Sequence, residues 1–285
     1  MQAVFICLHV WKGQLFMEEE KKIVQVKFSP VQSDRILAGQ NVLITGGGGG
    51  IGSAMARKFT SVGASVILVD NKPEKMEKVK AELAGYPVFT MTYDVTDTKD
   101  MPELFADAEK ISGKEVTILC ANAGISLHEH GITEVTREKF DLQIAVNLRA
   151  PFFLTKAFLE RYEKNARGRK ILITTSEAAD EGFDRPYGMT KAGLNNMIKA
   201  ISHRVYEKGM RINGIAPGVT ITDMTRDNIS STEQNLAYEG VAGRVMVPEE
   251  IAEVACFLIS DASTCISGEI IHCNASAHVR SYYKA

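Results

Sequence analysis

Residues 41–55 read NVLITGGGGGIGSAM, and the five consecutive glycines from Gly46 to Gly50 decide how the rest of the chain is interpreted. Glycine loses more backbone freedom on folding than any other residue, so such a run is either a linker or a place where side chains are excluded. A β-branched run precedes the glycines, and the helical stretch IGSAMARKFTSVG follows them. This order is typical of a phosphate-binding turn, so we expect a nucleotide-binding fold here and not a linker.

Short β-branched runs alternate with helical periods along the whole chain. We expect strands at 41–45, 65–70, 87–92, 116–121, 170–175, 211–216 and 269–273. We expect helices at 52–62, 73–83, 137–162, 187–208 and 248–260. This alternation, with the right-handed crossover rule, predicts an α/β doubly wound parallel sheet (a Rossmann fold) with helices on both faces.

The composition is that of an ordinary globular protein, with 285 residues, 45% of them hydrophobic, and a net charge of −2. No Pro- or Ser-rich linker divides the chain, so we expect one catalytic domain over residues 39–285. Lys and Arg are scattered, which argues against nucleic acid or a membrane as partner and favours a small molecule. The five cysteines have no metal-ligand spacing, so we expect no metal site and a cytoplasmic location.

Residues 1–38 are interpreted as an N-terminal arm of unknown role. The apolar run Ala3–Trp11 lacks the basic flank and the cleavage site of a signal peptide. It is also shorter than the roughly 20 residues that span a bilayer. We expect an arm that is wholly or partly ordered, or an upstream start codon with Met17 as the biological start.

The glycine-rich turn carries the pattern Thr45-Gly46-x-x-x-Gly50-Ile51-Gly52. In a dinucleotide site, glycines allow the tight turn, the approach of the pyrophosphate to the backbone, and the packing of the helix on the strand. The helix N-terminus then offers unpaired N–H groups to the phosphates. We therefore expect Thr45, Gly46, Gly50, Ile51 and Gly52 to bind the cofactor.

Asp70 ends the second strand about 20 residues further on, where a carboxylate can accept hydrogen bonds from the adenosine ribose. It would repel a 2′-phosphate, and position 49 carries Gly and offers no cation. Both features favour NAD over NADP. Asp70 could also simply form a strand-end turn with Asn71 and Pro73, and this interpretation is compatible with the first.

From about Gly39 to about Asn274 the chain resembles the short-chain dehydrogenase/reductase family. The family's motifs occur in order: Thr45 to Gly52 for TGxxxGxG, Asp94-Val95 for the acidic pair that meets the adenine, Ala121 to Gly124 for NNAG, Asn147, Tyr187 to Lys191 for YxxxK, and Pro217-Gly218 for PG. The resemblance implies that Asp94, Val95, Asn122, Ala123, Gly124, Pro217, Gly218 and Thr222 also bind the nicotinamide cofactor. The pattern is most similar to the 3-oxoacyl-carrier-protein reductase branch and its alcohol and hydroxysteroid dehydrogenase relatives.

Tyr187 and Lys191 are four residues apart and so share one face of a helix. A nearby ammonium would lower the phenol pKa from about 10 towards neutrality and make Tyr187 a general acid/base. The resemblance adds two roles: Lys191 holds the nicotinamide ribose, and Asn147 kinks its helix and holds a water in a proton relay.

The serine that the family places against the substrate oxygen is ambiguous here. By strand register it is Ser176, which lies 11 residues before Tyr187, whereas relatives commonly have about two more. Counting by spacing selects Thr174 instead. We choose Ser176, because a deletion in the apparent surface stretch EAADEGFDRP is easily absorbed; Thr175 is a further alternative.

Residues 223–244 follow the sixth strand and have the composition of a lid over the substrate. Phe183, Met189 and Tyr238 could form an apolar wall of the pocket. In relatives, the long helices at 137–162 and 187–208 build tetramers, so we expect a homotetramer or homodimer.

These features predict an NAD(H)-dependent oxidoreductase acting on the CH–OH group of a secondary alcohol, with Asn147, Ser176, Tyr187 and Lys191 as catalytic residues. A hydroxysteroid or polyol substrate ranks above 3-oxoacyl-carrier-protein reduction, for which a basic patch at Arg167, Arg169 and Lys208 could receive the acidic partner. Sugar-nucleotide enzymes of the same superfamily need a larger C-terminal domain than the 94 residues after Lys191. A non-catalytic NAD-binding sensor or scaffold is the alternative of a different class.

Overall fold

The computed structural model of the chain describes residues 9–11, 14–16, 35–225 and 244–279. A seven-stranded parallel sheet forms its centre, in the order β5-β4-β3-β6-β7-β8-β9. The strands are β3 (Asn41–Thr45), β4 (Ser65–Asp70), β5 (Val88–Thr92), β6 (Ile118–Ala121), β7 (Lys170–Thr174), β8 (Arg211–Pro217) and β9 (Ile270–Cys273). All seven lie within two residues of the predicted ranges, and the doubly wound fold is confirmed.

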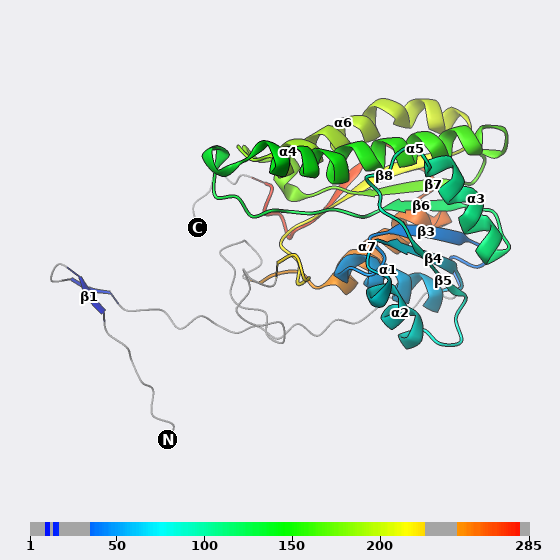
Figure 1. Cartoon of the computed structure of the whole chain (residues 1–285), viewed down its shortest axis with the longest axis horizontal. Coiled ribbons are helices and arrows are strands. Elements are labelled where there is room, and N and C mark those ends of the chain that lie inside the picture. The colour runs from blue at the N-terminus through cyan, green and yellow to red at the C-terminus, as the bar shows by residue number, and fades with distance from the viewer. Residues whose placement is uncertain (1–8, 12–13, 17–34, 226–243, 280–285) are drawn as a thin grey trace, which may run out of the picture.

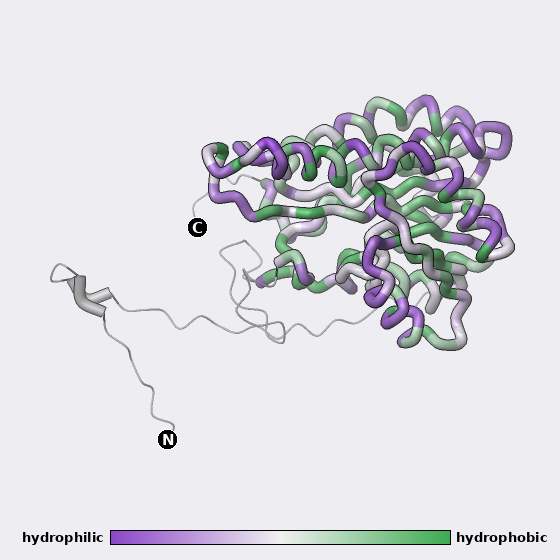
Figure 2. Tube along the Cα trace, viewed as in Figure 1, coloured by the Kyte–Doolittle hydropathy of each residue, from purple (hydrophilic) through white to green (hydrophobic). Residues whose placement is uncertain are grey.

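Helices cover both faces of this sheet (Figure 1). They are α1 (Gly50–Ser61), α2 (Pro73–Glu82), α3 (Met101–Ser112), α4 (Arg137–Ile144), α5 (Ala150–Arg161), α6 (Pro186–Glu207) and α7 (Pro248–Ile259). One hydrophobic cluster joins the sheet to α1, α2 and α7, and a second joins its other face to α3, α5 and α6. Because both faces are covered, β3, β7 and β8 are buried along their whole length, and the apolar stretches lie inside the layers (Figure 2).

Three details differ from the sequence-based prediction. Helix α3 was not predicted; it ends at Gly113, which adopts a left-handed conformation with φ 68°. The single helix expected over 137–162 is two helices joined by a π-helical turn, η2 (Ala145–Arg149). Leu37, which was expected to be part of the arm, is 1% exposed and belongs to the hydrophobic cluster that joins the sheet to α1, α2 and α7.

A short antiparallel pair lies within the predicted N-terminal arm. It consists of β1 (His9–Trp11) and β2 (Gln14–Phe16). The remainder of the arm before Arg35, and the predicted lid from Arg226 to Gly243 with Tyr238, lie outside the described residues.

Candidate active site

A cavity of about 1300 Å³ opens at the carboxyl ends of the parallel strands. Its walls come from the turns that follow β3, β4, β5, β6, β7 and β8. The cavity therefore includes the point between β3 and β6 where the strand order reverses. Ligands of doubly wound sheets bind at this point. Most of the predicted site residues line it: Gly46, Gly50, Ile51, Asp70, Asp94, Val95, Asn122, Ala123, Gly124, Ser176, Tyr187, Lys191, Pro217, Gly218 and Thr222. Thr45, Gly52 and Asn147 are not part of the lining.

The glycine-rich turn excludes side chains at its closest approaches. A Cβ at Gly52 would lie 2.2 Å from the carbonyl oxygen of Gly46. Gly46 itself has φ 66°, and a Cβ there would lie 2.9 Å from Ala123 Cα. Helix α1 begins at Gly50 and has no acidic residue in its first turn. Its N-terminus therefore fits a phosphate, and the residues present fit a dinucleotide.

Thr45 and Asn122 join neighbouring strand ends behind the cavity wall. The Thr45 hydroxyl accepts hydrogen bonds from the backbone amides of Asn122 (3.1 Å) and Ala123 (3.2 Å). In return, Asn122 Nδ2 donates to the Thr45 carbonyl at 3.1 Å, and Asn122 Oδ1 accepts from the Thr174 hydroxyl at 3.0 Å. Thr45 thus positions the wall and does not line it.

Asp70 combines both interpretations of the sequence. Its carboxylate accepts from the amide of Lys72 at 3.0 Å, which closes the strand-end turn, and from the amide of Gly48 at 3.1 Å, which fixes the glycine-rich turn. The side chain also lines the cavity, so one carboxylate shapes the turn and faces the ligand space.

Tyr187 and Lys191 stand at the start of α6, on the side of the helix that faces the cavity. Lys191 is 3% exposed, and its Nζ lies 5.7 Å from the centre of the Tyr187 ring. The same Nζ donates to the Thr174 carbonyl at 2.9 Å. The strand end of β7 therefore fixes the ammonium beside the phenol.

Burial controls the titration of both groups. It lowers the pKa of Lys191 to about 8. Burial also raises the pKa of Tyr187, against a lowering by the hydrogen bond with Ser176, and the charge of Glu177 raises it further. The phenol pKa in this structure is thus raised and not lowered towards neutrality as expected, because burial outweighs the Ser176 hydrogen bond.

The three hydroxyls left open by the sequence have different partners. Ser176 hydrogen-bonds the Tyr187 hydroxyl, and its Oγ accepts from the amide of Ala178 at 3.2 Å. The Thr174 hydroxyl donates to Asn122, and that of Thr175 donates to the Ile215 carbonyl at 3.2 Å. Of these three hydroxyls, the one next to the phenol belongs to Ser176.

Asn147 lies in the π-helical turn η2 and is fully buried. Its Oδ1 accepts from the amide of Ile125 and its Nδ2 donates to the Ile125 carbonyl, both at 2.8 Å. A Cβ at Gly124 would lie 3.4 Å from both Asn147 Oδ1 and Lys191 Nζ, so the two groups flank one small backbone position. π-Helical turns occur frequently at functional sites, and here the turn carries the predicted kink residue.

The stretch EAADEGFDRP is only partly a surface segment. Glu177, Phe183 and Arg185 line the cavity, and sequence reasoning missed Glu177 and Arg185. Glu177 directly follows Ser176, so its place in the cavity lining could have been predicted from its position in the sequence. Phe183 is part of the wall as expected, whereas Met189 is 49% exposed and lies outside the lining, because it points away from the Tyr187 face of α6.

Within the described ranges, no cluster of three or more His, Cys, Asp or Glu side chains could hold a metal ion. None of the helices in those ranges is long and apolar enough to cross a membrane.

Comparisons with known proteins place the chain among dehydrogenases and reductases. The family profile described as Enoyl-(Acyl carrier protein) reductase matches residues 46–278. A 3-oxoacyl-[acyl-carrier-protein] reductase of Rickettsia bellii is 32% identical over 239 residues, 84% of this chain and 96% of that protein. Short-chain dehydrogenase reductase 3b of Arabidopsis thaliana is 33% identical over 245 residues, 83% of this chain and 95% of that protein. The solved 3-ketoacyl-(acyl-carrier-protein) reductase from Brucella melitensis complexed with NADH is 26% identical with a TM-score of 0.75, covering 85% of this chain and 100% of its own.

Proposed function

The chain belongs to the short-chain dehydrogenase/reductase family of oxidoreductases, and from this we propose that it interconverts a secondary alcohol and a ketone with NAD(H). The observation that carries the proposal is the Ser176–Tyr187–Lys191 arrangement at one wall of the cavity, opposite the glycine-rich turn. We propose Asn147 as the residue that positions this wall from behind.

In the proposed reaction, the nicotinamide accepts or supplies the hydride when it is bound. Tyr187 takes the proton from the alcohol oxygen, or gives one to the ketone oxygen. Before substrate binds, the Ser176 hydroxyl bonds to the phenol and favours the phenolate; with substrate bound, Ser176 donates its single hydroxyl proton to the substrate oxygen instead. Lys191 stabilises the phenolate and also faces the ligand space, where a ribose hydroxyl could accept from it. Asp94, Val95, Ala123, Pro217, Gly218 and Thr222 complete the proposed cofactor contacts.

Asp70 supports NAD as the preferred cofactor. Its carboxylate lies in the cavity wall and already fixes the glycine-rich turn, and Gly49 in the same wall offers no cation. A 2′-phosphate near a carboxylate meets like-charge repulsion.

The test is a calorimetric titration of the purified full chain with NADH and with NADPH, repeated on Asp70→Ala and on Asp97→Ala. Asp97 follows the neighbouring strand and is not part of the cavity lining. NADH should bind more tightly than NADPH by about tenfold or more in the wild type and in Asp97→Ala, and Asp70→Ala should lose the preference. Tighter NADPH binding in the wild type would refute the cofactor assignment. Binding of neither cofactor would refute the oxidoreductase proposal.

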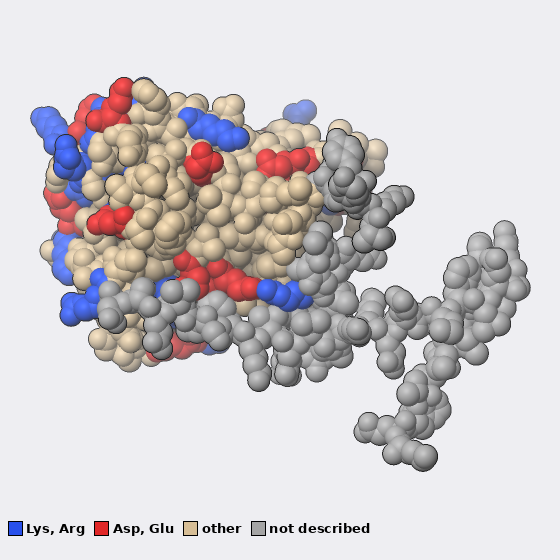
Figure 3. Space-filling view, turned by 180° about the vertical axis from the view of Figure 1, so that it is seen from behind, with Lys and Arg blue, Asp and Glu red and all other residues tan. Residues whose placement is uncertain are grey.

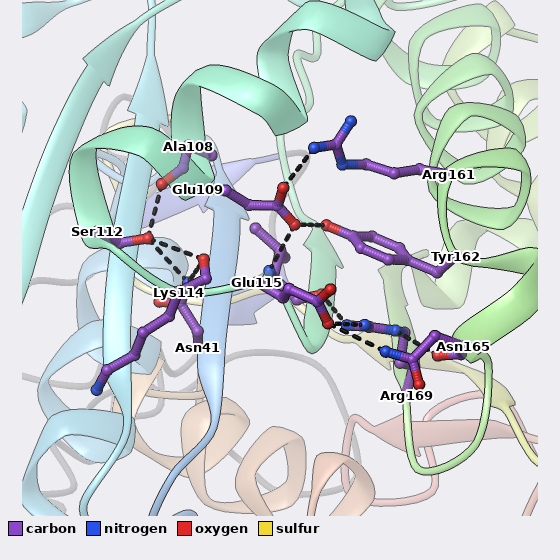
Figure 4. A network of polar contacts seen from close by, with 11 residues as sticks. Asn41, Ala108, Glu109, Ser112, Lys114, Glu115, Arg161, Tyr162, Asn165 and Arg169 are labelled. Carbon is purple, nitrogen blue, oxygen red and sulfur yellow. Dashed lines mark hydrogen bonds and ion pairs between the residues drawn. The ribbon is translucent and has the colours of Figure 1, made fainter.

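Reduction of a 3-oxoacyl carrier protein is the second candidate, because the relatives named above include reductases of that type. The basic patch suggested for it does not face the cavity. Arg169 is 4% exposed, pairs with Glu115 and stacks on Tyr162 at 3.8 Å (Figure 4). Lys208 pairs with Glu163 at 2.6 Å, and both cations lie at the amino ends of β7 and β8, opposite the site. A small alcohol is therefore the first choice, and a panel in which the acyl-carrier ketone is the best substrate would reverse the ranking.

We further propose that residues 39–285 act as a single cytoplasmic catalytic domain, that residues 1–38 form a separate arm, and that the protein is a homo-oligomer. On the face seen in Figure 3, charged side chains of both signs are scattered and separated by uncharged surface. That distribution offers no field of one sign to a nucleic acid on this face. A scaffold without catalysis would bind NADH but turn over no alcohol, ketone or acyl-carrier substrate in the panel.

A further inference from the structure

A carboxylate that the proposed reaction does not use lies next to the proposed reacting centre. Glu177 follows Ser176 directly, is half-buried, and lines the cavity. Its Oε2 lies 3.1 Å from the position that a Cβ on Gly218 would occupy, so the carboxylate packs against the turn after β8. Its charge also acts on the Tyr187 hydroxyl. Glu177 therefore lies close to the Pro217-Gly218 turn and near enough to the phenol for its charge to act there.

A chain of polar contacts holds this carboxylate in place. Asn274 Nδ2 donates to Glu177 Oε2 at 3.0 Å, and the Val219 amide also bonds to the carboxylate. Asn274 Oδ1 lies 2.9 Å from His278 Nδ1. The His278 ring stacks on His272 with centres 3.7 Å apart, and His272 Nε2 lies 2.7 Å from Asp180 Oδ2. A side chain supported in this way is preorganised, which is how a specificity residue reduces the entropy lost on binding.

We propose that Glu177 selects the substrate, by accepting a hydrogen bond from a second hydroxyl on the carbon adjacent to the one that is oxidised. The inference rests on the proposed alcohol dehydrogenase function and narrows it to vicinal diols and the α-hydroxy ketones they form. Val219 approaches Glu177 from the turn after β8, and Asn274 approaches it from the end of β9. The carboxylate lines the cavity and retains acceptor capacity for a ligand hydroxyl.

The polarity of the surrounding wall favours a hydroxyl over an apolar group. Ser176, Glu181 and Arg185 line the same part of the cavity. The Arg185 guanidinium stacks on Phe183 at 4.0 Å and donates to the Glu129 carbonyl at 2.8 Å. A steroid ring or an acyl chain would cover the Glu177 carboxylate without giving it a donor, and burial of an unpaired carboxylate is penalised.

A hydroxyl also fits better than a cationic group. Burial raises the pKa of the Glu177 carboxyl, the Asn274 bond lowers it, and the charge of Glu181 raises it again while His272 lowers it. Arg185 in the same wall would repel an ammonium, and a neutral hydroxyl meets no such repulsion.

The experiment compares matched alcohols that differ by one hydroxyl: cyclohexanol against 1,2-cyclohexanediol, and 2-butanol against 2,3-butanediol, each with NAD⁺ and with NADP⁺. The enzymes are wild type, Glu177→Leu, Glu177→Gln and Glu249→Gln, all checked for wild-type thermal unfolding. Glu177→Gln keeps the side-chain shape and one acceptor oxygen, so it still tests the inference if Glu177→Leu does not fold. Glu249→Gln is the control for loss of one negative charge, at an exposed position outside the cavity lining.

We expect kcat/KM of the wild type to favour the diol of each pair by about tenfold or more, since one buried hydrogen bond discriminates on this scale. Glu177→Leu should abolish the preference mainly through KM for the diol, Glu177→Gln should reduce it, and Glu249→Gln should keep it. In Glu177→Gln the rising limb of kcat/KM against pH should also move to lower pH, because loss of the neighbouring charge lowers the pKa of Tyr187.

Three results would overturn the inference. Equal or better oxidation of the monohydric alcohols by the wild type would refute it and leave the proposed function intact. Retention of the diol preference in Glu177→Leu would assign the selectivity to another residue. Absence of turnover with every alcohol, despite measured binding of NADH, would refute the proposed function itself and the inference with it.

Discussion

Ser176 is the residue whose replacement tests the hydroxyl assignment most directly. Its bond to the Tyr187 hydroxyl lowers a phenol pKa that burial raises. Ser176→Ala should therefore shift the rising limb of kcat/KM for alcohol oxidation to higher pH. It should also lower kcat/KM by about 10²-fold, the usual cost of losing a donor to the reacting oxygen. Steady-state kinetics across pH measure both effects.

Thr174→Val is the matched control, because the Thr174 hydroxyl donates to Asn122 and not to Tyr187. The control should leave the position of the pH limb unchanged. If Thr174→Val shifts the limb and Ser176→Ala does not, the spacing-based choice of Thr174 was right and the assignment to Ser176 is wrong.

Lys191 should oppose folding stability at neutral pH while serving the site. Burial lowers its pKa to about 8 in the folded chain, against about 10.4 when unfolded. The unfolded state thus binds more protons between these values, so wild-type stability should rise as pH increases from about 8 to about 10.4. Lys191→Met should gain up to about 3 kcal/mol relative to wild type at pH 7, and this gain should shrink towards pH 10.4.

Urea unfolding at pH 7 and near pH 10 measures the difference, with Lys199→Met as the control because Lys199 is exposed on the same helix. A gain that does not change with pH in Lys191→Met would show that its ammonium titrates normally. Activity should be lost in the same variant, as expected where a site trades stability for function.

At the residue scale, the sequence predicted which side chains line the site but not the pKa values of those side chains. The four-residue spacing of Tyr187 and Lys191 predicted their proximity, and strand register selected Ser176 as the hydroxyl for the substrate oxygen. The raised pKa of Tyr187 could not be predicted, because it depends on burial and on Glu177, and both are set by tertiary packing. Asn274 lies nearly a hundred residues from its partner Glu177, so no local pattern could join them.

Among the elements, the turn after β9 carries backbone strain that glycine would relieve. Ala275 and Ser276, which follow Asn274 after this strand, have positive φ angles of 50° and 69°. A left-handed conformation costs a side-chain-bearing residue about 1–2 kcal/mol. Ala275→Gly should therefore raise the free energy of unfolding by up to about 1 kcal/mol, after the extra backbone entropy of glycine is subtracted.

Ala84→Gly is the paired control, since Ala84 is exposed in a turn and does not have a positive φ. It should lose about 0.5–1 kcal/mol. Chemical denaturation of the two variants side by side gives the comparison, and destabilisation by both substitutions would show that the turn is not strained.

Element boundaries followed hydrophobic patterning closely, and the exceptions have physical causes. The strands are continuous β-branched runs because both faces of the sheet are covered. Their first and last residues could therefore be predicted from the sequence. Helix α3 was not predicted, although its Glu109 connects three parts of the chain. Glu109 accepts from Arg161 at the end of α5, from the Tyr162 hydroxyl just after it, and from the Val116 amide before β6 (Figure 4). The π-helical turn was foreseen only as a kink at Asn147, because its bonds to Ile125 come from a distant segment.

At the scale of the whole molecule, the parallel sheet separates chemistry from support. The carboxyl ends of the strands carry the cavity, while the amino ends carry ion pairs such as Arg169–Glu115 and Lys170–Asp261. Because every strand of this sheet runs the same way, residues far apart in the sequence meet at one edge. This polarity made the cavity-lining residues predictable from strand ends, and it makes the amino-end patch unsuited to a partner that must reach the cavity.

The helices α4 and α5 suggest how copies of the chain associate. Phe140, Leu142, Phe152 and Phe153 are large apolar side chains that are 37–49% exposed on these two helices. Large apolar side chains left exposed on neighbouring stretches of chain are typical of protein interfaces. We expect the protein to run as a dimer or tetramer of the 31.3 kDa chain in size-exclusion chromatography with light scattering.

Phe152→Glu should reduce the measured mass towards that of the single chain, because a buried interface does not tolerate an unpaired carboxylate. Glu160→Lys, which reverses an exposed charge on the same helix, should leave the mass unchanged. A wild-type protein that is already a single chain at every concentration would refute the assembly and leave the four side chains as ordinary exposed surface.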